Sequence, residues 1–133
     1  MNKLVLVIDS GLEIGLAANT ASVLTLSVGA KHPELIGDNL VDGSGQRHIG
    51  ITTIPIPVLS ADTPNLTALV QKLDDRDIEL VSFSKIAQSI HTYEDYANAL
   101  KSTPGEDIEY SGIALYGPKK AVDSLVGSLP RLK

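Results

Sequence analysis

The chain has 133 residues, of which 43% are hydrophobic and 20% charged. That length suits a single domain, and the composition is typical of a folded globular protein, which excludes a disordered or collagen-like chain. Sixteen acidic residues against eleven basic ones leave a formal charge of -5, so no general grip on nucleic-acid phosphates is expected. There is no cysteine, which excludes disulfides, thiolate nucleophiles and cysteine-ligated metal centres.

Neither a secretory signal nor a membrane span is predicted. The apolar run after Lys3 is stopped by Asp9 after only a few residues, which is too short for a secretory core. The longest apolar stretch, residues 14–30, is interrupted by several polar residues and is too short to cross a bilayer. The sequence therefore predicts a soluble, cytoplasmic protein with no membrane partner.

Four segments are predicted to form strands: residues 3–9, 51–59, 78–83 and 110–116. The first is a continuous valine-rich run that ends at Asp9, which is typical of a strand buried on both faces. The second contains Pro55 and Pro57, whose missing amide protons would face the same side. We therefore expect this strand at an edge of the sheet, paired through Ile54 and Ile56 on its other side.

Helices are predicted between these strands. Residues 14–28 are apolar or small on most sides, which predicts a buried helix. Start signals at Asp62, Ser84, Thr92 and Pro118 predict helices over 63–75, 85–88, 93–100 and 119–125. Alternation of strands and helices predicts a single α/β domain, a three-layer α/β/α fold with a small mixed sheet of about four strands. Ligands of such sheets tend to bind beyond the carboxyl ends of strands.

Residues 31–50 are polar and rich in turn-forming residues, and such long connections often have local structure or a function. Residues 40–48 could form a small hairpin that turns at Asp42-Gly43 or at Ser44-Gly45. The successive amides after Asp42 could also wrap an anion, although the lysine of a phosphate-binding loop is absent.

Several segments resemble peptidyl-tRNA hydrolase type II: the valine-rich start with its small-residue helix, residues 51–83, and the tail from Gly112 through Gly117-Pro118 to Leu129. A closer resemblance is to the uncharacterised bacterial family called domain of unknown function two thousand. Four short motifs carry this resemblance: Ile36-Gly37, Asp42-Gly43-x-Gly45, Arg76-Asp77-Ile78 and Tyr96-Ala97-Asn98.

The resemblance implies a peptidyl-tRNA hydrolase II-like fold and a homodimer, but not the hydrolase activity. Type II hydrolases have a lysine-rich stretch at the start of the first helix, where this chain has residues 15–18 without lysine. They also place a carboxylate after the third strand. Here residues 85–89 offer only the hydroxyl of Ser89.

The histidines His32, His48 and His91 are far apart in sequence, and no spacing of a metal site is present, so neither a metal nor another cofactor is expected. His91 precedes Glu94-Asp95. A general base oriented by a carboxylate has this pattern, and so does a solvated histidine beside a helix start, where acidic residues are favoured anyway.

Geometry predicts one cleft at the carboxyl end of the first strand, if residues 31–50 drape over that end. The candidate ligand-binding residues are Asp9, Ser10, Asn19, Thr20, Asp42, Gly43, Gln46 and His91. Two functions remain open. One is a module that binds a small molecule, without nucleic acid as a partner. The other is a small-molecule hydrolase or transferase that uses Ser89 and His91, or Asp9 and Ser10.

Overall fold

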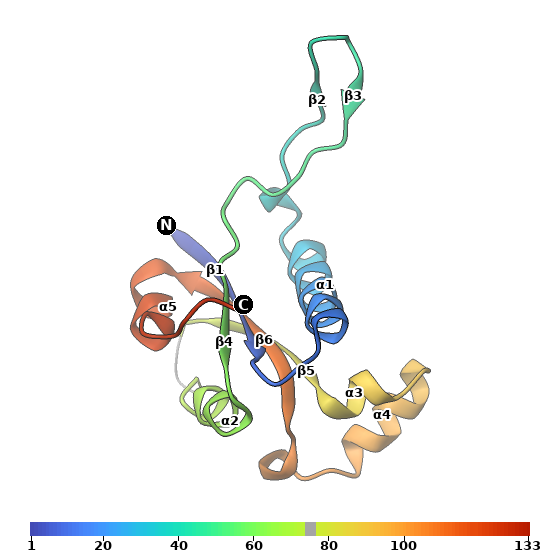
Figure 1. Cartoon of the computed structure of the whole chain (residues 1–133), viewed down its shortest axis with the longest axis vertical. Helices are drawn as coiled ribbons and strands as arrows, with labels where there is room; N and C mark the ends of the chain where they lie inside the picture. The colour runs from blue at the N-terminus through green and yellow to red at the C-terminus, as the bar shows by residue number, and fades with distance from the viewer. Residues whose placement is uncertain (74–76) are drawn as a thin grey trace.

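The computed structural model describes residues 1–73 and 77–133 and shows a mixed α/β fold (Figure 1). Strands alternate with helices much as the sequence predicts. In chain order the elements are β1 Asn2–Asp9, α1 Ile14–Lys31, η1 Pro33–Leu35, β2 Leu40–Val41, β3 Arg47–His48, β4 Val58–Ala61, α2 Thr63–Gln71, β5 Glu79–Ser84, α3 Lys85–Ser89, α4 Tyr93–Lys101, η2 Gly105–Asp107, β6 Tyr110–Pro118 and α5 Lys119–Val126.

The main sheet has four strands in the order β4-β1-β6-β5, so the predicted small mixed sheet is confirmed. β1 is parallel to β4 and antiparallel to β6, which in turn is antiparallel to β5. Leu6 of β1 lies opposite Val58 on one side and opposite Ala114 on the other. Because β6 runs against β1, the carboxyl end of β6 lies beside the amino end of β1.

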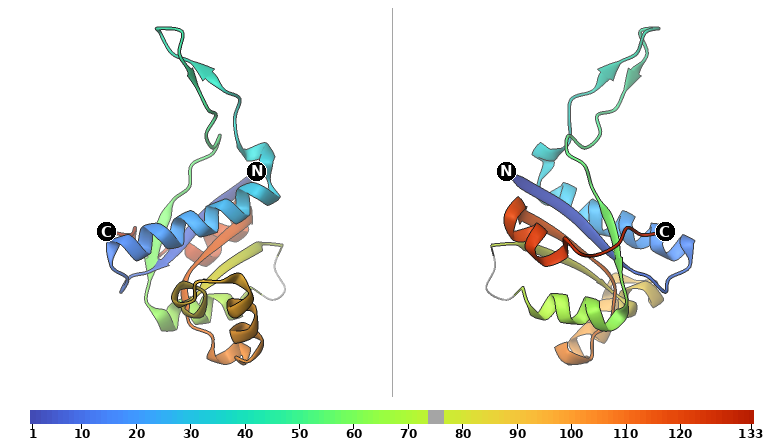
Figure 2. Two further views of the ribbon diagram at one scale, coloured as in Figure 1. Left: turned by 90° about the vertical axis from the view of Figure 1, so that its right-hand side faces the viewer. Right: turned by 60° about the vertical axis from the view of Figure 1, so that its left-hand side comes forward.

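Helices cover both faces of this sheet, so the three-layer arrangement is confirmed (Figure 2). Side chains alternate along β1. On one face Val5 and Val7 pack with the apolar side chains of α2 and α5. On the other face Leu4, Leu6 and Ile8 pack with those of α1.

The first helix is buried on one side only, so the prediction of an enclosed helix is wrong. Thr20 and Leu24 have no exposed surface, whereas Ile14 and Leu26 on the other side are 90% and 77% exposed. The sequence misleads because small and apolar residues occur on both sides of the helix. Only the packing of the sheet determines which side is covered.

The predicted helix starts are confirmed where a side chain caps them. Asp62, Ser84 and Thr92 each accept a hydrogen bond from the backbone N–H three residues further on. Such caps satisfy amides that have no partner inside the helix. Helix α2 ends at Gln71, and the last two residues of the predicted helix, 74 and 75, lie outside the described residues.

The strand predicted over 51–59 is shorter and shifted, because β4 spans only Val58–Ala61. β4 is the edge strand in the sheet order, as expected, but the explanation from the prolines is wrong. The carbonyl of Pro57 accepts a hydrogen bond from Leu6 N, so this proline faces β1. The outer side of β4 is covered instead by the C-terminal tail, where Ser60 N donates to Pro130 O and Leu132 N donates to Val58 O.

The hairpin predicted over residues 40–48 is confirmed as β2 and β3, which pair antiparallel. The carboxylate of Asp42 shapes its tip by accepting hydrogen bonds from the backbone amides of Ser44 and Gln46. Gly45 has φ 82°, a left-handed conformation that favours glycine. The hairpin projects away from the helices and the main sheet (Figures 1 and 2).

Within residues 1–73 and 77–133, no helix is both long enough and apolar enough to cross a membrane.

Replacing Gly112 with alanine should destabilise this fold. The new Cβ would lie 2.7 Å from Thr20 Cγ2 and 3.0 Å from the carbonyl oxygen of Val7. Relief of such crowding costs about 1–3 kcal/mol of the free energy of unfolding, and urea unfolding would measure the loss. Gly15→Ala is the matched control, because its Cβ would have no neighbour within 4 Å. Equal unfolding midpoints for the two variants would contradict this account.

Candidate functional site

The structure does not bring the predicted cleft together. Asp9 lies at the carboxyl end of β1, whereas Asp42, Gly43 and Gln46 are exposed at the tip of the hairpin (Figure 1). The reason is the length of α1, whose 18 residues return the chain by about 27 Å. The hairpin therefore starts from the opposite end of the sheet, where the ring of His32 lies at a tilt against that of Tyr116.

The other candidates lie along α1 and beside α3. Asn19 is exposed on α1, and Thr20 is fully buried under it. His91 is exposed between α3 and α4, at the rim of a hollow of about 320 Å³ that Phe83, Tyr93 and Tyr96 also line. Ser89 ends α3, and its hydroxyl donates to the carbonyl of Ile86 at 3.0 Å.

Asp9 belongs to a compact polar cluster at the carboxyl end of β1. Its side chain is 8% exposed and forms an ion pair with Lys85. Its carboxylate also accepts from the backbone N–H of Gly11 at 3.0 Å and from the hydroxyl of Thr63 at 3.4 Å. Burial is the largest influence on the pKa of Asp9 and raises it, but the bonds from Lys85, Gly11 and Thr63 together lower that pKa below its usual value. Asp9 is thus held as a carboxylate that joins β1, α2 and α3.

A second polar network lies next to this cluster. The side-chain amide of Gln88 donates to Thr20 Oγ1 at 3.0 Å, and its carbonyl accepts from the hydroxyl of Ser111 at 2.8 Å. Thr20 and Ser111 are both fully buried. Gln88 therefore forms hydrogen bonds with the buried hydroxyls of α1 and β6 and holds α3 against these two elements. Thr20 thus has a structural role and does not line a ligand-binding cleft.

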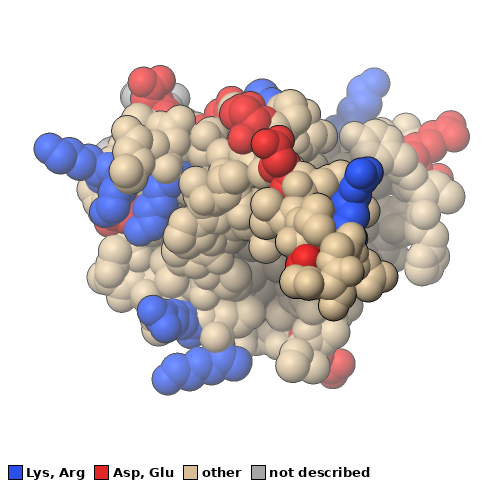
Figure 3. All heavy atoms as spheres, turned by 90° about the horizontal axis from the view of Figure 1, so that it is seen from above, with Lys and Arg blue, Asp and Glu red and all other residues tan. Residues whose placement is uncertain are grey.

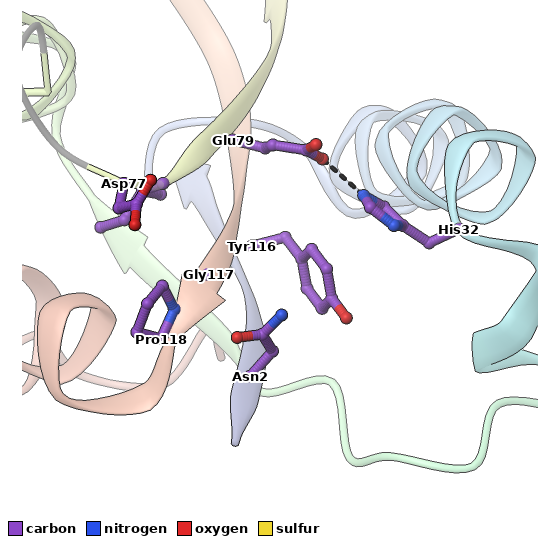
Figure 4. Close-up of a pocket in the computed structure, with 8 residues that line it drawn as sticks. Asn2, His32, Asp77, Glu79, Tyr116, Gly117 and Pro118 are labelled. Carbon is purple, nitrogen blue, oxygen red and sulfur yellow. Dashed lines mark hydrogen bonds and ion pairs between the residues drawn. The ribbon is translucent and has the colours of Figure 1, made fainter.

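A pocket of about 400 Å³ lies at the other end of the sheet, between the end of α1, the start of β5 and the carboxyl end of β6 (Figure 4). Its volume is within the usual range of small-molecule sites. It is lined by Asn2, His32, Asp77, Ile78, Glu79, Tyr116, Gly117 and Pro118. Gly117 allows the close approach of the chain before β5, because a Cβ there would lie 2.8 Å from the carbonyl oxygen of Asp77.

A histidine–carboxylate pair forms one wall of this pocket. His32 Nε2 and Glu79 Oε2 are 2.6 Å apart, and the ring of His32 lies 4.6 Å from that of Tyr116. Hydrogen bonding from His32 is the main reason that the pKa of Glu79 lies below its usual value, and the charges of His32 and Lys31 add to this effect. Glu34 Oε2 lies 3.5 Å from His32 Nδ1, so carboxylates face both ring nitrogens.

This wall is suited to holding a ligand by polar contacts. Glu79 engages His32 Nε2 at 2.6 Å, and the exposed carboxylate of Glu34 lies 3.5 Å from Nδ1. Asn2 and Tyr116 line the same pocket as Asp77 and Glu79 (Figure 4). Amide, phenol and carboxylate groups in one cavity can orient a small polar molecule by hydrogen bonds.

Sequence reasoning missed this pocket. His32 and Glu79 are 47 positions apart, and nothing in either local sequence indicates that they meet. The available signal was Gly117-Pro118 at the end of a strand, one of the places where ligands of α/β sheets bind. Across residues 1–73 and 77–133, no group of three or more histidine, aspartate or glutamate side chains is placed to hold a metal ion.

The fold and its pocket define an α/β protein of a recognised but functionally uncharacterised class. The chain belongs to the family described as "Protein of unknown function (DUF2000)", which matches residues 2–133. It is similar to the solved structure of a protein of unknown function from Agrobacterium tumefaciens, at 20% identity and a TM-score of 0.90, over 98% of this chain and 96% of that one. That likeness shows the fold. No curated protein matches this sequence.

Replacing Lys85 with methionine should destabilise the fold and change its dependence on pH. In the native chain the lowered pKa of Asp9 adds stability above the unfolded pKa of about 3.9, and this is lost as the pH falls through the folded value. Without Lys85, burial dominates and the pKa of Asp9 rises. The deficit of the variant should therefore grow as the pH rises from below the unfolded pKa of an aspartate to above the raised pKa of Asp9 in the variant, to about 1–3 kcal/mol.

Urea unfolding at several pH values would measure this deficit. Lys119→Met is the matched control, because Lys119 also pairs with an aspartate, Asp123, but is 56% exposed and shares that partner with Lys3. Its deficit should be small at every pH. A Lys85→Met deficit that is constant with pH would mean that Asp9 is not held ionised by Lys85.

Proposed function

We propose that this protein is a small-molecule-binding module and that its ligand occupies the pocket between α1, β5 and β6. The observation that carries the proposal is the convergence of Asn2, Tyr116 and the His32–Glu79 pair on one cavity of about 400 Å³. Each comes from a different element, and β1 and β6 hold Asn2 and Tyr116 in neighbouring strands. A site built on packed strands is rigid before its ligand arrives, which favours binding.

The charges of the pocket favour a ligand with a basic group. Asp77 and Glu79 contribute carboxylates, and Glu34 adds a third negative charge beside His32. Lys31 offsets part of this charge from outside, at 3.6 Å from Glu79. The phenol ring of Tyr116 can also lie against a cation. We therefore infer a small polar molecule that carries an amine or a guanidinium group.

Binding is favoured over the hydrolase or transferase alternative. Ser89 is bonded within its own helical turn, and Asp9 is engaged by Lys85 rather than by Ser10. Among the described residues, the hydroxyls of Ser10 and Ser89 make no hydrogen bond to a histidine or a carboxylate. Nucleophilic catalysis needs such a base within reach, and His91 lies on the solvent-exposed loop after α3.

We also infer a relation to the fold of peptidyl-tRNA hydrolase type II, on the sequence resemblance stated above, without its activity. Residues 15–18, which stand where that family has lysines, contain none. A peptidyl-tRNA cleavage assay is therefore expected to be negative. A cytoplasmic location and the absence of a nucleic-acid partner remain predictions from the composition.

The proposal is tested by thermal unfolding in the presence of small basic compounds (ethanolamine, histamine and arginine) and of acidic ones (acetate and citrate). A compound that binds the native state raises the unfolding temperature by mass action. We expect a shift with at least one basic compound and with neither acid. Titration calorimetry should then show at least tenfold weaker binding to Glu79→Gln, which is about 1.4 kcal/mol.

The chain offers a matched control in the hairpin. Asp42 Oδ2 lies 2.8 Å from His48 Nε2, so Asp42→Asn removes a carboxylate that also bonds a histidine, but far from the pocket. Asp42→Asn should bind the hit as the native chain does. The proposal is wrong if no basic compound shifts the unfolding temperature, or if both substitutions weaken binding equally.

A further inference from the structure

The hairpin and the strands that lead into it form an exposed arm, defined here as residues 38–51. Every residue from 38 to 49 is exposed. Three of the aliphatic side chains, Val41, Ile49 and Ile51, are 65%, 84% and 77% exposed. A two-stranded ribbon alone in water is at best marginally stable. An arm of this kind gains stability when another surface covers its apolar side chains.

The base of the arm is tightly built, which fixes its direction. A Cβ at Gly50 would lie 1.8 Å from the carbonyl oxygen of Gly37. The two segments at the base of the arm can therefore approach this closely only with glycine at position 50. The backbone N–H of Gly50 donates to Asn39 Oδ1 at 3.0 Å, and that of Gly37 donates to Ile51 O at 2.8 Å. The arm therefore leaves the domain in a defined direction, held at its base by these hydrogen bonds.

A matching hollow lies on the exposed side of α1, near the base of the arm. It has a volume of about 460 Å³ and is lined by Ser22, Thr25, Leu26, Gly29, Ala30 and Ile36. Leu26 is 77% exposed. A Cβ at Gly29 would meet nothing within 4 Å, so the fold of one chain does not require glycine there. Because glycine inside a helix costs about 0.5–1 kcal/mol relative to alanine, the close approach of a second backbone would explain it.

We propose that the arm of each chain docks in the hollow on α1 of a second copy, forming a twofold dimer. Each copy carries both the arm and the hollow, as a self-complementary interface requires. Burying an aliphatic side chain fully is worth about 1.5–3 kcal/mol, which at about 25 cal/mol per Å² corresponds to roughly 60–120 Å² of area. Leu40 points to the opposite face of the hairpin from its neighbour Val41. The side chains of Val41, Ile49, Ile51 and Leu26 therefore supply about 240–480 Å² per copy, part of the roughly 800 Å² that a stable pair buries per partner.

The charges also favour a second copy as the occupant. The six lining residues of the hollow are uncharged, so docking there buries no charge of the hollow itself. Seen from the end that carries the arm, this face shows both basic and acidic side chains, some of them side by side, amid uncharged surface (Figure 3). The formal charge of -5 disfavours an anionic membrane or a nucleic acid on this face.

Light scattering coupled to size exclusion tests the proposal on the whole chain at micromolar concentration. The native protein should have twice the mass of the 14.1 kDa chain. Ile49→Lys, which charges the arm, and Gly29→Gln, which fills the hollow, should each return the mass of one chain. Because Ile49 is largely exposed and a Cβ at Gly29 would meet nothing within 4 Å, circular dichroism should show both variants folded.

Ile14→Lys is the matched control. Ile14 is 90% exposed and begins α1, at the end away from the hollow. This variant should keep the dimer mass. The proposal is overturned if the native chain has the mass of one chain, if either test variant stays dimeric while folded, or if Ile14→Lys separates the dimer to the same extent.

Discussion

The burial of β1 on both faces and its pairing on both edges are the constraint on which the rest of the structure depends. Val5 and Val7 reach the layer of α2 and α5, and Leu4, Leu6 and Ile8 reach the layer of α1, each at most 2% exposed. Burying such a side chain contributes about 1.5–3 kcal/mol. One strand therefore joins both hydrophobic clusters, and the helices on either side take their positions from it.

The directions of the neighbours of β1 make the two ends of the sheet chemically different. At the carboxyl end of β1, the polar groups are used inside the fold: Lys85 and Thr63 engage Asp9, and Gln88 satisfies Thr20 and Ser111. At its amino end, the antiparallel β6 places Pro118 opposite Asn2 and Tyr116 opposite Leu4, and a cavity remains there. The end of the sheet at the carboxyl end of β1 thus holds buried ionic and hydroxyl groups that stabilise the fold, and the end at the amino end of β1 holds the open pocket.

Helix α1 links these two ends. Its buried side follows Ala17, Thr20, Leu24 and Val28 along the sheet. Its last residue precedes His32, which forms the wall of the pocket with Glu79. Its outer side remains apolar in places, and a helix that needed only to be soluble would carry charge there. The same helix therefore supports the core, the pocket and the surface from which the arm projects.

Local sequence by itself determined the kinds of element and many of their boundaries. The unbroken apolar run of β1 indicates a strand buried on both faces, and the side chains of Asp62, Ser84 and Thr92 mark helix starts because they cap free amides nearby. Asp42 and Gly45 specify the turn of the hairpin for the same reason, since a turn depends on residues a few positions apart.

Tertiary structure alone decided which faces are covered and which distant residues meet. The sequence of α1 has apolar or small residues on most sides of the helix, but the sheet covers only the side that carries Leu24. His32 and Glu79 meet because β5 lies beside β6 under the end of α1. The hairpin does not lie near Asp9, because α1 carries the chain to the other end of the sheet. Such contacts depend on strand order and on helix length across the whole domain, which no local pattern of residues encodes.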